Sequence, residues 1–146
     1  MKKLSTDQNY KNYMKFLVIG DLNQAEISLK KSIADTHYDN DVLSFLLQRL
    51  GSLVYLKGDE TQALKLYDSS IELTKNSLIS LLLYAKFLCN ECKKYCAAID
   101  LCNSIIQTTL SDNYPESETE ARKDYYLNEA KKVVAECNKF LGLLGQ

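Results

Sequence analysis

The chain has 146 residues and a formal net charge of -1 at pH 7, from 18 Lys and Arg against 19 Asp and Glu. This length is typical of one domain and permits a hydrophobic core that needs no disulfide or metal. The near-neutral charge excludes the basic field that supplies most nucleic-acid affinity, so we expect no nucleic-acid partner. Five Gly and one Pro in a chain that is 46% hydrophobic favour long helices over a loop-rich or disordered protein.

The location of the protein is predicted from its apolar segments and its cysteines. No segment approaches the ~18 consecutive apolar residues of a membrane span, and the two lysines of MKKLSTDQNY have no apolar stretch behind them. Five cysteines, an odd number, fit free thiols in a reducing compartment better than a disulfide framework. We therefore expect a cytoplasmic protein with no membrane partner.

Apolar residues recur at spacings of three and four along most of the chain, which predicts an all-α fold of about seven helices. The first six helices pair into stacked antiparallel hairpins, because a short turn joins each pair. The seventh follows a polar stretch and presents one apolar face. In chain order the predicted helices span residues 5–18, 21–36, 40–56, 60–75, 78–91, 95–109 and 117–141.

The turns inside the hairpins repeat one pattern, with alanines 38 and 35 residues apart. In the best copy Gly58 is predicted to adopt positive φ, and Asp59 to cap the next helix, with Gln62 placed to reach back. Ala63 allows two helices to cross closely, and Tyr67 fills the wider gap one turn later. The other copies are Gly20, Asp21, Ala25 and Leu29, and the degenerate Lys93, Ala98 and Cys102.

This pattern resembles the tetratricopeptide repeat family, whose signature has Leu-Gly in the first helix, a Gly-centred turn, then Ala and an aromatic residue in the second. The resemblance implies a single domain over residues 1–146, with three degenerate repeats at about 6–38, 44–77 and 79–110 and a C-terminal capping helix at about 117–141. The middle repeat carries the resemblance best, through Leu47, Leu50, Gly51, Gly58, Ala63 and Tyr67.

Four of the cysteines lie within residues 89–102. Cys89 and Cys102 occupy predicted core positions, where a buried thiol behaves as a small hydrophobe. Cys92 and Cys96 straddle a turn, which leaves open a thiol-based metal or redox protein, although no nearby His or second Cys pair completes a ligand set. Because the only His is His37 and no phosphate-binding or hydrolase motif occurs, we expect no enzyme, no cofactor and no metal.

The resemblance also implies a concave groove, lined by the first helix of each repeat, that holds a peptide or helix of another protein. An aromatic and Met-bearing groove suits an apolar or amphipathic helix. Filling by the capping helix or by a sister subunit in a homodimer stays open. The groove residues would be Tyr10, Met14, Leu17, Gln48, Ser52, Tyr55, Leu56, Leu83, Tyr84 and Phe87, with Arg49 and Glu91 at its edges.

One known ligand of this family, an acidic C-terminal tail, is disfavoured by the residues present. The clamp for such tails needs Lys, Asn and Arg at places that fall here on Tyr10, Met14, Arg49, Ser80 and Tyr84, and none of these is Lys or Asn. We therefore predict a non-enzymatic protein–protein interaction module, an adaptor or small chaperone-like scaffold. A self-associating structural subunit is the alternative.

Overall fold

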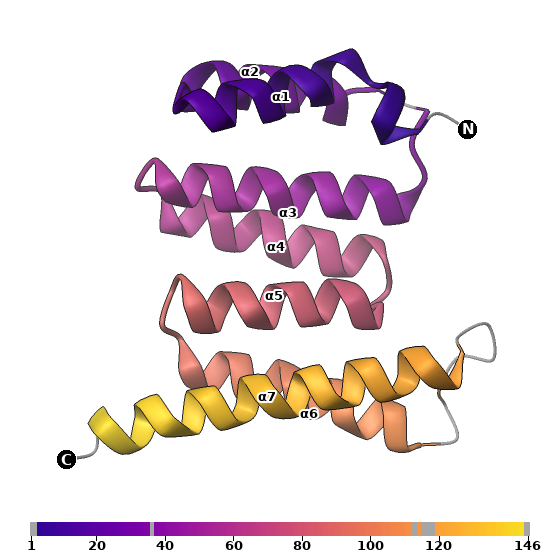
Figure 1. Cartoon of the computed structure of the whole chain (residues 1–146), viewed down its shortest axis with the longest axis vertical. Helices are drawn as coiled ribbons and strands as arrows, with labels where there is room; N and C mark the ends of the chain where they lie inside the picture. Colours follow the sequence, from indigo (N-terminus) through magenta and orange to yellow (C-terminus); the bar gives the residue numbers. More distant parts are fainter. Residues whose placement is uncertain (1–2, 36, 112–113, 115–118, 145–146) are drawn as a thin grey trace. The chain divides into compact units, whose positions relative to one another are not determined.

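The computed structural model describes residues 3–35, 37–111, 114 and 119–144. These residues form seven α-helices, a short 3-10 helix at Leu4–Thr6 and no strand, which confirms the predicted all-α class (Figure 1). Every helix in this part of the chain is too short or too polar to span a bilayer. The helices are α1 (Gln8–Ile19), α2 (Leu22–Ile33), α3 (Asn40–Leu56), α4 (Glu60–Leu73), α5 (Leu78–Asn90), α6 (Tyr95–Leu110) and α7 (Glu120–Leu144).

The helix ends lie within three residues of the predicted bounds. The predicted start of the last helix, at residue 117, lies outside the described residues, and α7 begins at Glu120. The helix α4 ends at Leu73 instead of residue 75. Its end follows from Lys75 and Asn76, which have φ values of 53° and 60° and cannot continue a right-handed helix.

The chain forms two compact units, Met1–Asn76 and Ser77–Gln146. In unit 1, α1 and α2 form one antiparallel hairpin, α3 and α4 form a second, and α2 packs against α3 (Figure 1). In unit 2, α5 and α6 form a hairpin, and α7 packs against both of its helices. Because α7 contacts both helices, its buried residues Ala130 and Cys137 are part of the core of unit 2.

Small residues allow the helices of each hairpin to approach closely, as the repeat pattern predicts. Ala25, Ala63 and Ala98 have no exposed surface. A Cβ added at Gly51 would lie 2.8 Å from Cδ2 of Tyr67 and 3.2 Å from the carbonyl oxygen of Ala63. The hairpin of α3 and α4 therefore closes only because residue 51 has no side chain.

The turns inside the hairpins have the predicted left-handed backbone. The φ values are 82° at Gly20 and 96° at Gly58. In the third hairpin Lys93 occupies the corresponding place with a φ of 56°, a conformation that is unfavourable for a residue with a Cβ. The degenerate copy therefore keeps the turn without the glycine.

The cap of α4 confirms one half of the prediction and contradicts the other. The Asp59 side chain accepts the backbone N–H of Gln62 at 3.1 Å, as expected of an N-cap. The expected return bond from the Gln62 side chain to the Asp59 backbone was wrong. The Asp59 N–H donates instead to the Val54 carbonyl at 3.0 Å, because the left-handed turn at Gly58 closes this bond across the end of α3.

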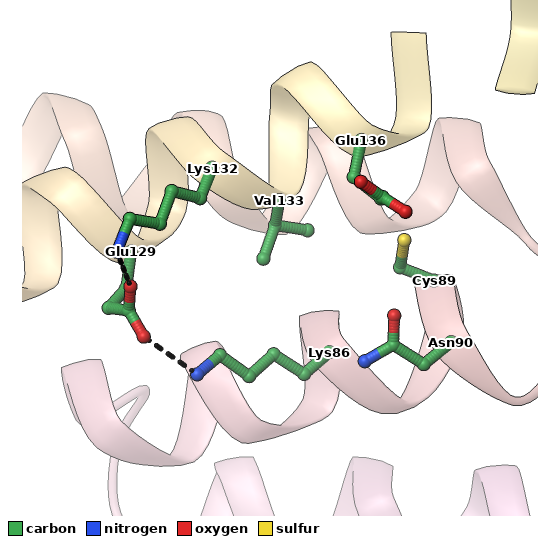
Figure 2. Close-up of a pocket in the computed structure, with 7 residues that line it drawn as sticks. All are labelled: Lys86, Cys89, Asn90, Glu129, Lys132, Val133 and Glu136. Carbon is green, nitrogen blue, oxygen red and sulfur yellow. Dashed lines mark hydrogen bonds and ion pairs between the residues drawn. The ribbon is translucent and has the colours of Figure 1, made fainter. Parts of the chain in front are cut away.

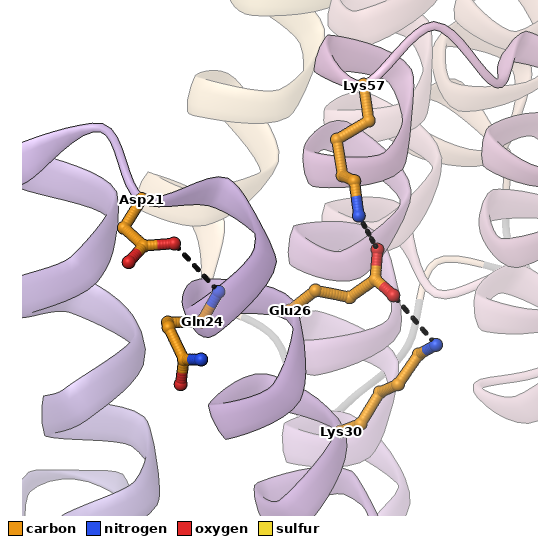
Figure 3. A network of polar contacts seen from close by, with 5 residues as sticks. All are labelled: Asp21, Gln24, Glu26, Lys30 and Lys57. Atoms are coloured by element: carbon orange, nitrogen blue, oxygen red, sulfur yellow. Dashed lines mark hydrogen bonds and ion pairs between the residues drawn. The ribbon is translucent and has the colours of Figure 1, made fainter.

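An ion-pair network connects α2 to the end of α3 within unit 1 (Figure 3). The Glu26 carboxylate lies 2.9 Å from Nζ of Lys30 and 3.2 Å from Nζ of Lys57. The hydrogen bond from Lys30, more than that from Lys57, lowers the pKa of Glu26. At neutral pH the network therefore stays charged and helps to fix α3 beside the first hairpin.

Candidate functional site

Two helix stripes in unit 1 form one surface, which we call the α1–α3 face. Residues at i, i+4 and i+7 share one side of a helix, and both stripes follow this spacing. The rings of Tyr10 and Phe45, with centroids 6.5 Å apart, join the stripes. The face consists of Tyr10, Met14, Leu17 and Val18 of α1 and Phe45, Arg49, Ser52 and Leu56 of α3.

The α1–α3 face exposes large apolar side chains. Met14 is 50% exposed, Val18 87% and Leu56 61%. Leu17 and Phe45, which belong to the same face, are each half-buried. Apolar side chains gathered on one surface indicate an interaction site more often than scattered ones do.

A cation lies among the aromatic rings of this face. The guanidinium carbon of Arg49 is 5.3 Å from the centroid of the Phe45 ring, within cation–π distance. Its Nε is buried and makes no hydrogen bond to the described residues. Burial raises the pKa of Tyr10 and Tyr13, and the positive charge of Arg49 opposes that shift at both phenols. The guanidinium field therefore acts on the α1 side of the face as well.

Polar bonds to α4 fix α3 behind the face. The Gln48 amide donates to Oγ of Ser70 at 3.0 Å, and the Ser44 hydroxyl donates to the Ser70 carbonyl at 2.9 Å. Ser52 and Tyr67 share a hydrogen bond of 2.7 Å between their hydroxyl oxygens. These contacts hold α3 in one rotational position, which presents Arg49 and Ser52 on the α1–α3 face.

The structure brings together only some of the predicted groove residues. Gln48 is 1% exposed and contacts α4, and Tyr55, seven residues on, lies on the same side of α3. Tyr84 and Phe87 lie in unit 2 and are only 7% and 5% exposed, so neither presents a surface to a partner. The residues that the α1–α3 face does unite are Tyr10, Met14, Leu17, Arg49, Ser52 and Leu56, while Leu83 is half-buried and Glu91 exposed in unit 2.

The sequence prediction missed two members of the face. Phe45 precedes Arg49 by one helical turn, and this spacing was the signal for it. Val18 follows Met14 by one helical turn and was indicated by the same spacing that selected Met14.

A separate surface pocket of about 270 Å³ lies between α5 and α7 in unit 2 (Figure 2). Glu129 of α7 lies between two cations, 3.1 Å from Lys86 of α5 and 3.1 Å from Lys132 of its own helix. The hydrogen bond from Lys132, followed by that from Lys86, lowers the pKa of Glu129. The central charges of the pocket are therefore already paired and fasten α7 to α5. The lining residues are Lys86, Cys89, Asn90, Glu129, Lys132, Val133 and Glu136.

The cysteines divide into a buried set and an accessible pair. Cys89, Cys102 and Cys137 are at most 3% exposed in the core of unit 2, whereas Cys92 is half-buried and Cys96 exposed. Burial, reinforced by Cys89, raises the pKa of Cys102 to about 11 and that of Cys137 to about 12. In the described residues no group of three or more His, Cys, Asp or Glu side chains is arranged to hold a metal ion.

Native thiol alkylation is expected to separate these two sets. Iodoacetamide at about pH 8 should modify Cys96 fastest and Cys92 next, because attack requires an accessible thiolate. Cys102 and Cys137 should react only after denaturant is added, since their thiols are buried and protonated. Time-resolved peptide mass spectrometry measures all the sites in one sample. Early modification of Cys102 in folded protein would contradict the buried arrangement.

The remaining candidate for chemistry, His37, lies on the surface between α2 and α3. Its Nδ1 is 2.6 Å from the Asp35 carboxylate, and its side chain is 76% exposed. An exposed His–Asp pair between adjacent helices fits a local loop contact.

Comparisons of the chain with protein-family models, with curated proteins and with solved structures found no match in any of the three.

Proposed function

We propose that the protein is a non-enzymatic protein–protein interaction module that binds an amphipathic helix of another protein on the α1–α3 face. The exposure of Met14 and Val18, one helical turn apart and on the same surface as Leu56, carries the proposal. A partner helix with apolar residues at i, i+3, i+4 and i+7 has the matching stripe.

The architecture supports a role as a tetratricopeptide-like scaffold. Each hairpin uses a left-handed turn, and a buried Ala lies at the helix crossing. Unit 1 adds Gly51 and Tyr67, the glycine and the aromatic residue of the family signature, and the Tyr67 ring lies where a side chain at residue 51 would be. A cytoplasmic adaptor or small chaperone-like scaffold is the corresponding cellular role, and no catalysis is included in the proposal.

A second copy of the chain is a poorer occupant of this face than a different protein. A two-fold dimer interface places the same patch of each subunit against the other. Here it would bring the Arg49 charges of both copies toward one apolar surface, where like charges oppose association. We therefore propose that the partner is a different protein.

Substitution of the exposed apolar residues tests this proposal. Met14→Asp and Val18→Asp are expected to abolish retention of the partner, because a carboxylate there must be desolvated on docking. Leu110→Asp is the matched control, since Leu110 is 68% exposed in unit 2 and receives the same change. Affinity capture from a cell lysate with chemical crosslinking identifies both the retained segment and its attachment site.

Three results distinguish the possible roles of the face. Retention by wild type and by the Leu110 variant, but not by the α1 variants, with crosslinks to α1 or α3, supports the proposal. Equal retention by all variants contradicts it. A wild-type dimer in analytical ultracentrifugation that Val18→Asp converts to monomer would instead assign the face to self-association.

A further inference from the structure

We infer that the partner helix carries an acidic side chain beside its apolar stripe and that this carboxylate pairs with Arg49. The inference rests on the proposed function, because it specifies the chemistry of the occupant of the same α1–α3 face. The inference is based on the Arg49 guanidinium, which lies over the Phe45 ring and has no anionic partner among the described residues.

The surroundings of Arg49 leave one of its polar atoms unsatisfied. The guanidinium lies over the Phe45 ring, and Nε is buried without a hydrogen bond to the part of the chain that the structure describes. Nε itself is covered, but Arg49 as a whole is only half-buried, so its charge is within reach of an anion on a partner. A carboxylate is the fitting acceptor, because two N–H groups of a guanidinium can donate to its two oxygens in parallel.

The charges of the two helices also favour an acidic ligand. Along α1 and α3 the only charged residues are the cations Lys11, Lys15 and Arg49 and a single acid, Asp41 in the first turn of α3. The helix α4 has the opposite balance, with the acids Glu60, Asp68 and Glu72 against Lys65. A chain with a net charge of -1 therefore carries an excess of positive charge on the two helices of the α1–α3 face.

The register of the helices places this charge next to the apolar anchors. The helices α1 and α3 run in the same direction, because the chain reverses once between α1 and α2 and once more between α2 and α3 (Figure 1). The Tyr10 and Phe45 rings contact each other, so Met14 and Arg49, each four residues further along, lie at the same level. A helix that docks an apolar residue on Met14 therefore brings a neighbouring side chain to Arg49.

Four pools of designed peptides test the inference with the full-length protein. Each peptide has about 18 residues, five helical turns, with randomised Leu, Ile, Met and Phe at i, i+3, i+4 and i+7, and the C-terminus is amidated in the first three pools. One position beside the apolar stripe is Glu in the first pool, Gln in the second and Lys in the third. A fourth pool has Gln at that position and a free C-terminal carboxylate.

Wild type is expected to retain the Glu pool about tenfold more strongly than the Gln pool, a difference of about 1.4 kcal/mol. Arg49→Gln should abolish this difference, and Arg49→Glu should reverse it in favour of the Lys pool. Lys65→Glu makes the same change of charge at an exposed position on α4 and should keep the wild-type preference. Circular dichroism confirms that each variant remains folded, and Arg49→Gln serves if Arg49→Glu does not fold.

The inference and the proposed function fail in distinguishable ways. Equal retention of the Glu and Gln pools overturns the inference and leaves an apolar docking face in place. A preference for the free C-terminal carboxylate overturns it in favour of a chain terminus as the ligand. If wild type retains none of the four pools, the proposed function fails and the inference fails with it.

Discussion

Replacing Gly51 with alanine is expected to lower the free energy of unfolding by about 1–3 kcal/mol, the usual cost of overpacking a core. The added Cβ would lie 2.8 Å from Cδ2 and 2.9 Å from Cε2 of Tyr67, which is closer than carbon atoms approach without displacement. Tyr67 cannot easily move away, because it is 1% exposed and its hydroxyl is bonded to Ser52. Urea denaturation followed by circular dichroism measures the loss.

Two variants separate this steric effect from the helix preference of alanine. A Cβ added at Gly142 in α7 would meet no heavy atom of the described residues within 4 Å, so Gly142→Ala should leave stability unchanged or raise it by up to about 1 kcal/mol. In a Tyr67→Leu background the cost of Gly51→Ala should fall below about 1 kcal/mol, because the ring atoms nearest to the new Cβ are gone. An unchanged cost in that background would show that Tyr67 is not the obstacle.

The hairpins of this chain were predictable because their signals are local. Gly58 and Asp59 specify a left-handed turn followed by a cap, and both requirements follow from neighbouring backbone groups. Ala63 predicted the close crossing, because a methyl group fits there and a longer side chain does not. The end of α4 was placed too late. Asn76 is a residue type that adopts the left-handed backbone after a helix, but Lys75 gives no such signal, and both have positive φ.

The contacts that the sequence did not predict are those that depend on distant segments. Gln48 was assigned to a partner groove from the resemblance to tetratricopeptide repeats, yet it is buried against Ser70, 22 residues along the chain. The Cys137 thiol approaches Cys89 because α7 packs against α5, and a spacing of 48 residues carries no signal for such a contact. Both contacts, Gln48 with Ser70 and Cys137 with Cys89, depend on the packing of helices that are distant in the sequence.

The candidate site was predicted only in part, because the exposure of its residues also depends on distant segments. The family resemblance selected Tyr10, Met14 and Arg49, and these residues share one surface of unit 1. The same resemblance selected Tyr84 and Phe87 on α5, and both are buried. A repeat pattern specifies which side of a helix a residue occupies, whereas its exposure depends on what covers that helix.

Replacing Asp7 with alanine is expected to cost about 2–4 kcal/mol, the sum of a lost N-cap and a lost hydrogen bond to a charged group. Asp7 is 1% exposed, and its carboxylate accepts the backbone N–H groups of Asn9 at 2.8 Å and Tyr10 at 3.2 Å. The same carboxylate accepts the hydroxyl of Tyr38, from the segment between α2 and α3. One side chain thus starts α1 and holds this connecting segment, and urea denaturation measures its contribution.

Asp59→Ala is the matched control, because Asp59 is an exposed N-cap with a single bond of 3.1 Å, and its loss should cost about 1 kcal/mol or less.

Burial, followed by the hydrogen bond to Asp7, raises the pKa of Tyr38 above its usual value. A raised pKa means that the folded state holds the proton more tightly, so this stabilisation is complete below about pH 10 and is lost as the pH rises further. The stability difference between wild type and Tyr38→Phe should therefore narrow above about pH 10. A difference that stays constant with pH, or equal costs for the Asp7 and Asp59 variants, would contradict the buried Asp7–Tyr38 bond.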